Sequence, residues 1–179
     1  MAREIERRFL VRDTGFLAGR VGEAIVQGYV AKESGAMSTR VRVRGDKAFL
    51  TLKGARSGIA RDEFEYPIPI ADALHILANH CGNRLIQKTR FLVPYHGQTF
   101  EVDVFEGKHA GLVIAEIELA HERQPILLPP WVGAEVSLDP RYGNFSLAQF
   151  EGPVRPFDGG QHAAALATMT PEAHLFAAH

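Results

Sequence analysis

The segment STRVRVRGDKAFLTLKG, residues 38–54, alternates between polar and apolar residues on both sides of a Gly45-Asp46 pair. Because successive side chains of a strand point to opposite faces of a sheet, this period of two predicts β-strands. Glycine and aspartate favour tight turns, so the pair is expected to separate a strand over 38–45 from a strand over 48–54. Arginines and valines alternate in the first strand, and one face of the hairpin is therefore strongly basic.

The same alternation, with many β-branched and aromatic residues, continues over most of residues 1–138. The other strands that it predicts are 3–11, 24–32, 60–67, 85–95, 98–106, 112–120 and a shorter 133–137. Apolar residues on one face, followed by Gly82, predict a helix over 72–81. Weaker helical patterns cover 14–19 and 146–150. The fold class expected is α+β, dominated by β.

The composition excludes several classes of protein. The chain has 179 residues, 46% of them hydrophobic, which is enough to build a core without disulfides or structural metals. The single cysteine, Cys81, cannot form an internal disulfide, and the N-terminal sequence MAREIERRFL lacks the apolar core of a signal peptide. No run of the sequence approaches the roughly 18 apolar residues of a membrane-spanning helix. We therefore expect a cytoplasmic protein that does not bind membranes.

Basic and acidic residues nearly cancel, with 20 Lys and Arg against 21 Asp and Glu. A protein that coats nucleic acid through bulk positive charge is therefore not expected. The composition changes after Gly152, where proline, glycine and then alanine become frequent. We predict one domain over residues 1–150 and an appendage over residues 151–179 that is partly extended or helical.

Charged residues at alternating positions form pairs of one sign. These pairs are Glu4/Glu6, Arg40/Arg42, Glu63/Glu65, Lys88/Arg90, Glu101/Asp103 and Glu116/Glu118. The ordinary interpretation of such a pattern is the solvated face of an amphipathic sheet. However, neighbours of one sign on one face repel each other and need compensation. A closed eight-stranded antiparallel β-barrel would provide it, with the charges in its lumen and a few helices packed outside.

A lumen that contains both signs of charge suits one class of ligand. Arginine forks bind phosphate oxygens in pairs and lysine adds a point charge, so the basic strands favour a polyphosphate. Carboxylate oxygens are ligands of hard cations such as Mg²⁺ or Mn²⁺. Because such charges are costly to bury unless they are paired or occupied, the pattern predicts a site for a polyphosphate and a divalent metal ion.

The motifs and their order resemble a known family. The stretch EIERRFLV, residues 4–11, resembles the ExExK signature of the CYTH superfamily, the triphosphate tunnel metalloenzymes. The later motifs are QGY at 27–29, RVR at 40–42, TLKG at 51–54, Arg61 with Glu63 and Glu65, KTR at 88–90, Asp103, EIE at 116–118, EVS at 135–137, and Asp139, Arg141, Tyr142 and Asn144. The resemblance covers residues 1–150 and implies an eight-stranded antiparallel barrel that forms a tunnel.

The resemblance also implies roles for individual residues. The phosphate-binding residues that it implies are Arg8, Arg40, Arg42, Lys53, Arg61, Lys88 and Arg90. The metal ligands that it implies, for Mg²⁺ or Mn²⁺, are Glu4, Glu6, Asp103, Glu116 and Glu118. The catalytic group that it implies is Glu4, Glu6, Arg8, Glu63 and Glu65. Arg8 stands where the family has lysine, and since the two are not interchangeable at a phosphate, an altered rate or substrate preference stays open.

The chain has no added domain that would point to a protein or nucleic-acid substrate, so a small-molecule triphosphate is expected. The resemblance implies metal-dependent hydrolysis of inorganic tripolyphosphate to diphosphate and phosphate, as in the short bacterial triphosphatases. Three alternatives stay open: a class IV-type adenylate cyclase, a thiamine or nucleoside triphosphatase, and a non-catalytic polyphosphate-binding module. A homodimer is also compatible with an enzyme of this size.

Overall fold

Nine antiparallel strands of one sheet carry the alternating residues, and the computed structural model describes them within residues 3–30 and 37–150. The strands are β1 (Arg3–Val11), β2 (Glu23–Tyr29), β3 (Ser38–Arg44), β4 (Lys47–Lys53), β5 (Ala60–Ile68), β6 (Leu85–Tyr95), β7 (Gln98–Phe105), β8 (Val113–Glu118) and β9 (Val132–Glu135). Their order in the sheet is β5-β4-β3-β2-β6-β7-β8-β1-β9.

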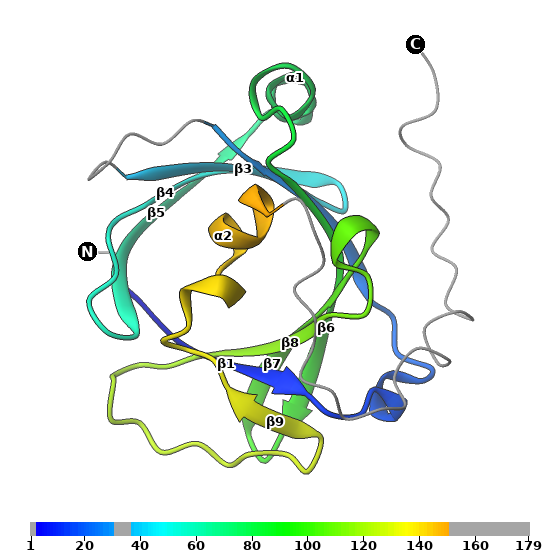
Figure 1. The fold of residues 1–179 in the computed structure, drawn as a ribbon, viewed down its shortest axis with the longest axis vertical. Coiled ribbons are helices and arrows are strands. Elements are labelled where there is room, and N and C mark those ends of the chain that lie inside the picture. The colour runs from blue at the N-terminus through cyan, green and yellow to red at the C-terminus, as the bar shows by residue number, and fades with distance from the viewer. Residues whose placement is uncertain (1–2, 31–36, 151–179) are drawn as a thin grey trace.

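Pairing between β1 and β5 closes the sheet into a barrel (Figure 1). The first residues of β1 pair with β5, Arg3 opposite Asp62, while the middle of β1 pairs with β8. The end of β1 pairs with β9, which thereby extends the sheet beyond the closed ring. The ring itself consists of β1 to β8, and the expected eight-stranded antiparallel barrel is confirmed.

Two of the hairpin turns, one of them the predicted Gly45-Asp46 turn, have the backbone that their residues favour. Gly45, with φ of 55°, turns the chain between β3 and β4. His96 and Gly97, with φ of 47° and 76°, connect β6 to β7. Positive φ at both central residues is the conformation of the type I′ turn, whose twist matches that of the two strands.

Helix α1 (Ile70–His80) packs on the outside of the barrel, as the sequence predicts. Its Ala73 and Leu77 are buried against Val41 of β3 and Ala48 of β4. These contacts cover the apolar outer face of the hairpin whose inner face is basic. The alternation of arginine and valine therefore places one kind of side chain in the lumen and the other under α1.

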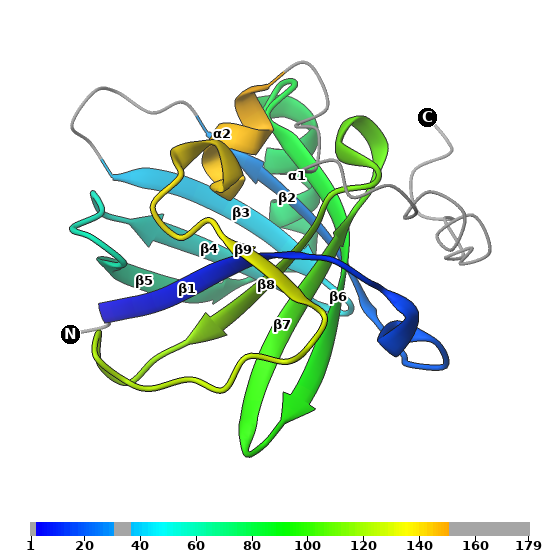
Figure 2. The ribbon, with the colours of Figure 1, turned by 60° about the horizontal axis from the view of Figure 1, so that its bottom comes forward.

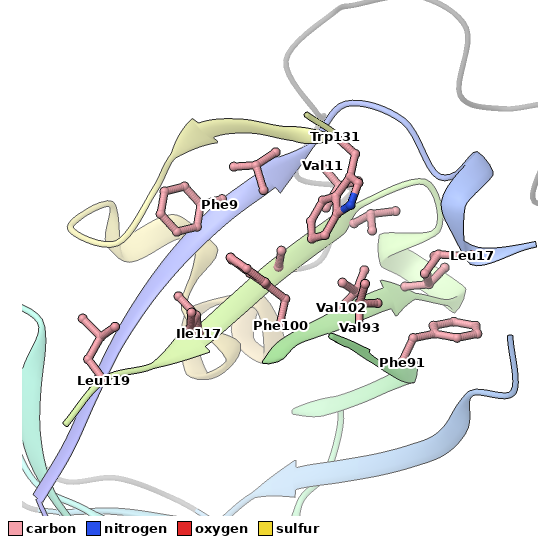
Figure 3. Packing of buried hydrophobic residues seen from close by; sticks show 14 of the residues in the cluster. Phe9, Val11, Leu17, Phe91, Val93, Phe100, Val102, Ile117, Leu119 and Trp131 are labelled. Carbon is pink, nitrogen blue, oxygen red and sulfur yellow. The ribbon is translucent and has the colours of Figure 1, made fainter. Parts of the chain in front are cut away.

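A second apolar cluster covers the outer face of β1, β6, β7 and β8 (Figure 3). It buries large side chains such as Phe9, Phe91 and Phe100, each of which contributes about 1.5–3 kcal/mol by leaving water. Trp131, just before β9, packs on this cluster and stacks on Phe16 with ring centroids 4.2 Å apart. Phe16 belongs to the short 3₁₀ helix η1 (Gly15–Leu17), so segments far apart in sequence shield this face together.

Helix α2 (Asn144–Gln149) differs from the expectation that the helices pack outside, because it closes one end of the barrel (Figure 1 and Figure 2). Leu147 is buried there with the inward-facing Ile86 and Ile114. The 3₁₀ helix η3 (Pro140–Tyr142) leads into α2. A third, η2 (Gly107–His109), supports it, with His109 Nε2 2.7 Å from the carbonyl oxygen of Leu147.

Several boundaries differ by a few residues from the predicted ranges. β2 ends at Tyr29, β8 is shorter at both ends, and β9 begins one residue earlier and ends two earlier. The end of the predicted strand 24–32 and the whole appendage 151–179 lie outside the described residues. Among the residues that the structure describes, no helix is long and apolar enough to cross a membrane.

Candidate active site

Inward-facing side chains of the barrel surround a cavity of about 370 Å³. Because alternate residues of β1 point inward, Glu4, Glu6 and Arg8 line it, while Ile5 and Phe9 belong to the outer cluster. The predicted site residues that line the cavity are Glu4, Glu6, Arg8, Arg40, Arg42, Lys53, Arg61, Glu63, Glu65, Arg90, Glu116 and Glu118. The period of two in the sequence thus places these charges around one space.

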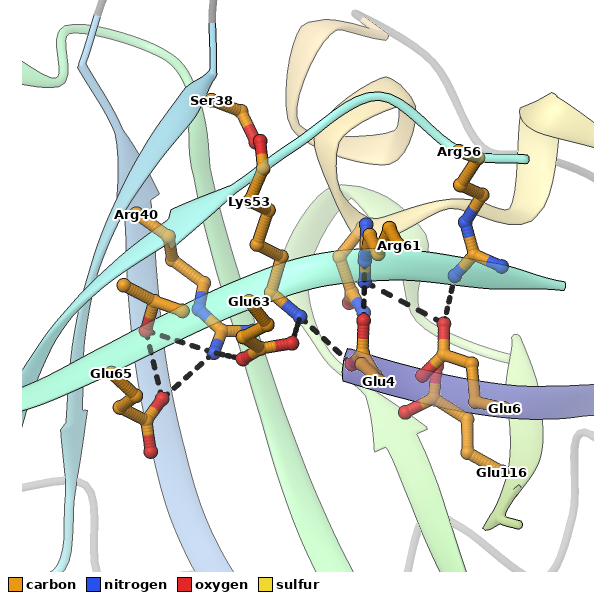
Figure 4. A network of polar contacts seen from close by, with 12 residues as sticks. Glu4, Glu6, Ser38, Arg40, Lys53, Arg56, Arg61, Glu63, Glu65 and Glu116 are labelled. Carbon is orange, nitrogen blue, oxygen red and sulfur yellow. Dashed lines mark hydrogen bonds and ion pairs between the residues drawn. The ribbon is translucent and has the colours of Figure 1, made fainter. Parts of the chain in front are cut away.

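The basic face of β3 is held by a carboxylate from β5 (Figure 4). Glu65 Oε2 accepts hydrogen bonds from Arg40 Nη2 at 3.1 Å, Arg42 Nη2 at 2.9 Å and Thr51 Oγ1 at 2.8 Å. Burial raises the pKa of Glu65, but Arg42, Thr51 and Arg40 outweigh it and bring the pKa below its ordinary value. Glu65 is therefore ionised and orients both arginines toward the cavity.

Lys53 of β4 joins the basic group to the acidic residues of β1. Its Nζ lies 2.6 Å from Glu63 Oε2 and 3.0 Å from Glu4 Oε1. Glu4 also accepts a hydrogen bond from Arg61 Nε. Although burial raises the pKa of Glu4, Lys53 and Arg61 outweigh it and hold the pKa well below its usual range. Glu4 is therefore a carboxylate at any physiological pH.

Glu6 has a different environment, although it is the next inward-facing residue after Glu4 on β1. Arg56, Arg61 and Arg8 contact its Oε1, Arg61 at 3.6 Å and Arg8 Nε at 3.7 Å. Glu116 lies beside it (Figure 4). Burial, and then the charges of Glu116 and Glu4, raise the pKa of Glu6 to about 7. Desolvation and the neighbouring carboxylates thus outweigh the opposing effect of Arg56 and Arg61 on this pKa.

These carboxylates fit a divalent cation in charge and in donor type. Glu6 pairs with Glu118 in the ladder between β1 and β8, and Glu116 is the next inward residue of β8. Clustered carboxylate oxygens are the ligands that Mg²⁺ and Mn²⁺ prefer. Within residues 3–30 and 37–150, no group of three acidic, histidine or cysteine side chains is already arranged to hold a metal ion. The side chains must therefore turn toward an ion to ligate it.

Two of the predicted site residues, Lys88 and Asp103, are not in the lining of the cavity, although Lys88 Nζ lies 3.3 Å from Oδ1 of Asn144, which is in that lining. Both are buried, and Lys88 Nζ donates to Asp103 Oδ2. Asp103 also accepts from Arg90 at 2.6 Å through each of its two oxygens. Arg90 does line the cavity and contacts Glu116 at 2.9 Å. Asp103 and Lys88 therefore position Arg90.

Arg8 lines the cavity but is already bonded to the backbone. Its Nη1 donates to the carbonyl oxygen of Tyr142 at 2.7 Å and its Nη2 to that of Ser137 at 3.1 Å. Arg8 thus connects β1 to the segment that enters α2.

The sequence pattern missed other cavity residues. Arg56 belongs to the loop between β4 and β5, and Asn144 and Phe145 begin α2. Loop and helix residues do not follow the period of two, so that pattern could not select them. Glu101 and Arg44 do follow it and also line the cavity, although they were not among the predicted site residues.

This chain is similar to known proteins in sequence and in fold. An inorganic triphosphatase of Acetivibrio thermocellus is 43% identical over 149 residues, which cover 83% of this chain and 95% of that protein. An inorganic triphosphatase of Nitrosomonas europaea is 37% identical over 150 residues, 81% of this chain and 96% of that protein. The crystal structure of an inorganic triphosphatase matches with a TM-score of 0.64 and 32% identity, over 85% of this chain and 98% of that one.

The family model of the CYTH domain matches residues 2–149, which include every described strand and all the cavity residues named above. The sequence motifs, the closed barrel with its charged lumen and this match agree with one another. The chain therefore belongs to the CYTH domain family.

Proposed function

We propose that this protein hydrolyses inorganic triphosphate to diphosphate and phosphate inside the barrel, with Mg²⁺ or Mn²⁺ as its cofactor. The observation that carries the proposal is the lining of the cavity, where arginines and a lysine of β3 to β6 face the glutamates of β1 and β8. A purely anion-binding module would not need that acidic side. The two relatives named inorganic triphosphatase support the same substrate.

In this proposal the basic side binds the phosphate oxygens. The residues that contact substrate are Arg40, Arg42, Lys53, Arg61 and Arg90, all of which line the cavity. Glu65 and Glu63 hold Arg40, Arg42 and Lys53 in place before substrate arrives. Donors that are oriented in advance stabilise developing charge without reorganising during the reaction. The catalytic role expected of Glu63 and Glu65 is therefore one of positioning.

The acidic side holds the cofactor and the attacking water. Glu4, Glu6, Glu116 and Glu118 are the proposed ligands of a divalent ion, which when bound would supply positive charge for the phosphates and the leaving diphosphate. A carboxylate of this group orients a water molecule toward the terminal phosphorus and takes one of its protons. The water oxygen forms a bond to that phosphorus, the bridging P–O bond breaks, and diphosphate leaves with the bond electrons.

Arg8, Lys88 and Asp103 act on the site through other residues in this proposal. Asp103 is fully buried and bonded to Lys88 and Arg90, so in this proposal it orients Arg90 instead of ligating metal. Lys88 supplies the positive charge that compensates the negative charge of Asp103. Arg8 donates to the carbonyl oxygens of Ser137 and Tyr142, and its Nε lies 3.7 Å from Oε1 of Glu6.

A substrate panel tests the proposal against its alternatives. The purified protein is incubated with Mg²⁺ or Mn²⁺ and tripolyphosphate, ATP or thiamine triphosphate, and phosphate and cyclic AMP are measured. We expect phosphate from tripolyphosphate with the highest kcat/KM. Cyclic AMP from ATP, or a preference for thiamine triphosphate, would replace the proposed substrate. Tight binding of tripolyphosphate without turnover would show a binding module instead of an enzyme.

A pair of glutamate variants tests the metal ligands. Glu118→Gln removes one charge from the acidic side of the cavity, whereas Glu122→Gln removes one from an exposed pair with Arg3. We expect Glu118→Gln to raise the Mg²⁺ concentration needed for half-maximal activity by about tenfold or more. Glu122→Gln is expected to leave it unchanged. Full metal-dependent activity of Glu118→Gln would contradict the ligand assignment.

We also propose a cytoplasmic location and leave a homodimer as a prediction. Cys81 is buried and unpaired, which is typical of proteins from reducing compartments. Fractionation of cells that express the tagged full chain tests the location, and sedimentation equilibrium tests the oligomeric state.

A further inference from the structure

The loop between β4 and β5 places one more arginine in the cavity. Arg56 reaches Glu6 with its Nη2, and its guanidinium lines the cavity beside Arg61 (Figure 4). Its other terminal nitrogen, Nη1, is buried and makes no hydrogen bond within the described part of the chain. Arg56 thus lines the cavity and has a buried terminal N–H group without an acceptor, and such a guanidinium is suited to bind an anion.

Arg56 is bound by fewer carboxylates than Lys53 of β4 and Arg90 of β6. Lys53 contacts both Glu4 and Glu63, and Arg90 contacts Asp103, Glu101 and Glu116. The carboxylate contact of Arg56 is with Glu6, and a quarter of its side chain is exposed, against 7% for Lys53 and Arg90. Its guanidinium can therefore change partners at lower cost than theirs.

The backbone that carries Arg56 is nevertheless anchored. Ser57 and Ala60 exchange backbone hydrogen bonds of 2.8 and 3.1 Å across a turn in which Gly58 has a φ of 62°. The carbonyl oxygen of Ile59 accepts from the backbone nitrogen of Glu6 at 3.2 Å. The loop is thus fastened to β1 at the same residue that the Arg56 side chain contacts, so only the side chain has to move.

Glu6 lies between two sets of charges that favour different partners. Arg56, Arg61 and, at 3.7 Å, Arg8 contact its Oε1, while Glu4 and Glu116 add negative charge beside it. A divalent cation at the glutamates would take over the neutralisation of Glu6, and Arg56 would then have both terminal nitrogens free. A phosphate oxygen of the entering substrate is the acceptor that this geometry offers.

We propose that Arg56 neutralises Glu6 in the free protein and moves to a substrate phosphate when a divalent cation and triphosphate enter. Arg56 is then both a competitor of the metal ion and a phosphate-binding residue. This proposal rests on the proposed function, and it adds a substrate contact from a loop to those from the strands. It predicts that removal of the guanidinium weakens the binding of triphosphate and strengthens the binding of the divalent cation.

Variants of Arg56 test both effects. We expect Arg56→Gln to raise the KM for tripolyphosphate about tenfold to a hundredfold, the value of one or two charge-assisted hydrogen bonds. The same variant is expected to bind Mn²⁺ several-fold more tightly than the wild type when no phosphate compound is present, as measured by calorimetry. Arg56→Lys keeps the charge but loses the fork, so both effects are expected to be smaller.

Arg3→Gln is the matched control, because it removes the same charge from an exposed pair with Glu122 outside the cavity. We expect it to change neither KM nor Mn²⁺ affinity. An unchanged KM in Arg56→Gln, or weaker Mn²⁺ binding by both Arg56 variants, would overturn the role of Arg56. Absence of turnover in the wild type would overturn the proposed function alone, because the calorimetric comparison of Mn²⁺ and tripolyphosphate binding still tests Arg56.

Discussion

Arg8 donates hydrogen bonds to the backbone carbonyl oxygens of Ser137 and Tyr142. No other side chain in the described part of the chain donates to either of them. Removing its guanidinium leaves both acceptors buried without a partner. We expect Arg8→Met to lower the free energy of unfolding by about 2–5 kcal/mol. Arg8→Lys restores the residue type of the ExExK signature. It is expected to lower the free energy of unfolding by less, since its ammonium group can still donate to one of the two carbonyl oxygens.

Urea unfolding of the two Arg8 variants measures the loss, and hydrogen exchange locates it. Exchange is expected to rise first in residues 140–149, which the guanidinium anchors. Arg3→Gln is the control on the exposed surface. If Arg8→Met kept the stability and exchange protection of the wild type, the anchoring role would be wrong and the substrate contact implied by the resemblance would regain support.

The raised pKa of Glu6 makes the stability of the metal-free protein depend on pH. Its pKa is about 7 in the folded state against 4.5 for an unperturbed glutamate. Between these values the folded state binds more protons at Glu6 than the unfolded chain does, so stability falls as pH rises. The contribution is complete below about pH 4.5 and is lost as pH rises through about 7.

Glu4 does not obscure this effect, because its lowered pKa makes a contribution that is already complete above the unfolded value. Urea unfolding of the metal-free protein at pH 5.5 and pH 8 measures the change. We expect the wild type to lose stability over this range and Glu6→Gln to lose clearly less. Equal losses in the two proteins would show that Glu6 is ionised throughout.

At the scale of elements, α2 is a short helix that depends on its contacts. Leu147 is fully buried in the apolar end of the barrel, and His109 and Arg8 hold the helix and its entry. We expect Leu147→Ala to cost about 2–4 kcal/mol of stability, since it leaves a cavity against Ile86 and Ile114. Phe150→Ala is the control, because Phe150 is half exposed at the end of α2.

Thermal unfolding and limited proteolysis measure this loss. If α2 closes the end of the barrel as described, proteolysis near residues 140–150 is expected to accelerate in Leu147→Ala before the barrel itself unfolds. Similar behaviour of Leu147→Ala and Phe150→Ala would mean that burial of Leu147 contributes little to holding the helix.

Strands such as β3 could be predicted from the sequence because they have one face in the lumen and one face under apolar cover. Arg40 and Val41 illustrate this, since they lie one residue apart and end on opposite sides of β3. The place of α2 could not be predicted, because a short apolar helix packs equally well inside or outside a barrel. Arg56 could not be predicted either, since its position depends on a turn and not on a repeat.

The sequence also could not show which lumen charges reach the cavity. Lys88 and Arg90 are equivalent in the alternation, yet only Arg90 lines the cavity, and Glu101 lines it while Asp103 does not. Depth along a strand depends on the tilt of the barrel and on what fills its closed end. Both are properties of the assembled fold, which a local pattern does not contain.

At the scale of the whole molecule, ligands are expected to stabilise the barrel because its lumen concentrates charge of both signs. A non-hydrolysable triphosphate analogue with Mg²⁺, at a hundred times its dissociation constant, contributes about 2.7 kcal/mol. For a chain of this size that raises the Tm by roughly 5–10 °C. Thermal scans with the analogue alone, with Mg²⁺ alone and with both measure it. No additional shift with both together would contradict joint binding.

The pairing of β1 with β8 and β9 has a consequence for how the chain folds. β1 is made first, but its partners Glu118 and Glu135 lie more than a hundred residues later in the sequence. Contacts so distant in sequence slow folding, because the intervening loop must close before they form. Hairpins such as β3–β4 and β6–β7 can form as soon as they are synthesised, whereas the first strand waits for the last ones. Glu6 meets Glu116 and Glu118 only in that final step, so a partly synthesised or misfolded barrel has its phosphate-binding arginines but not its acidic site.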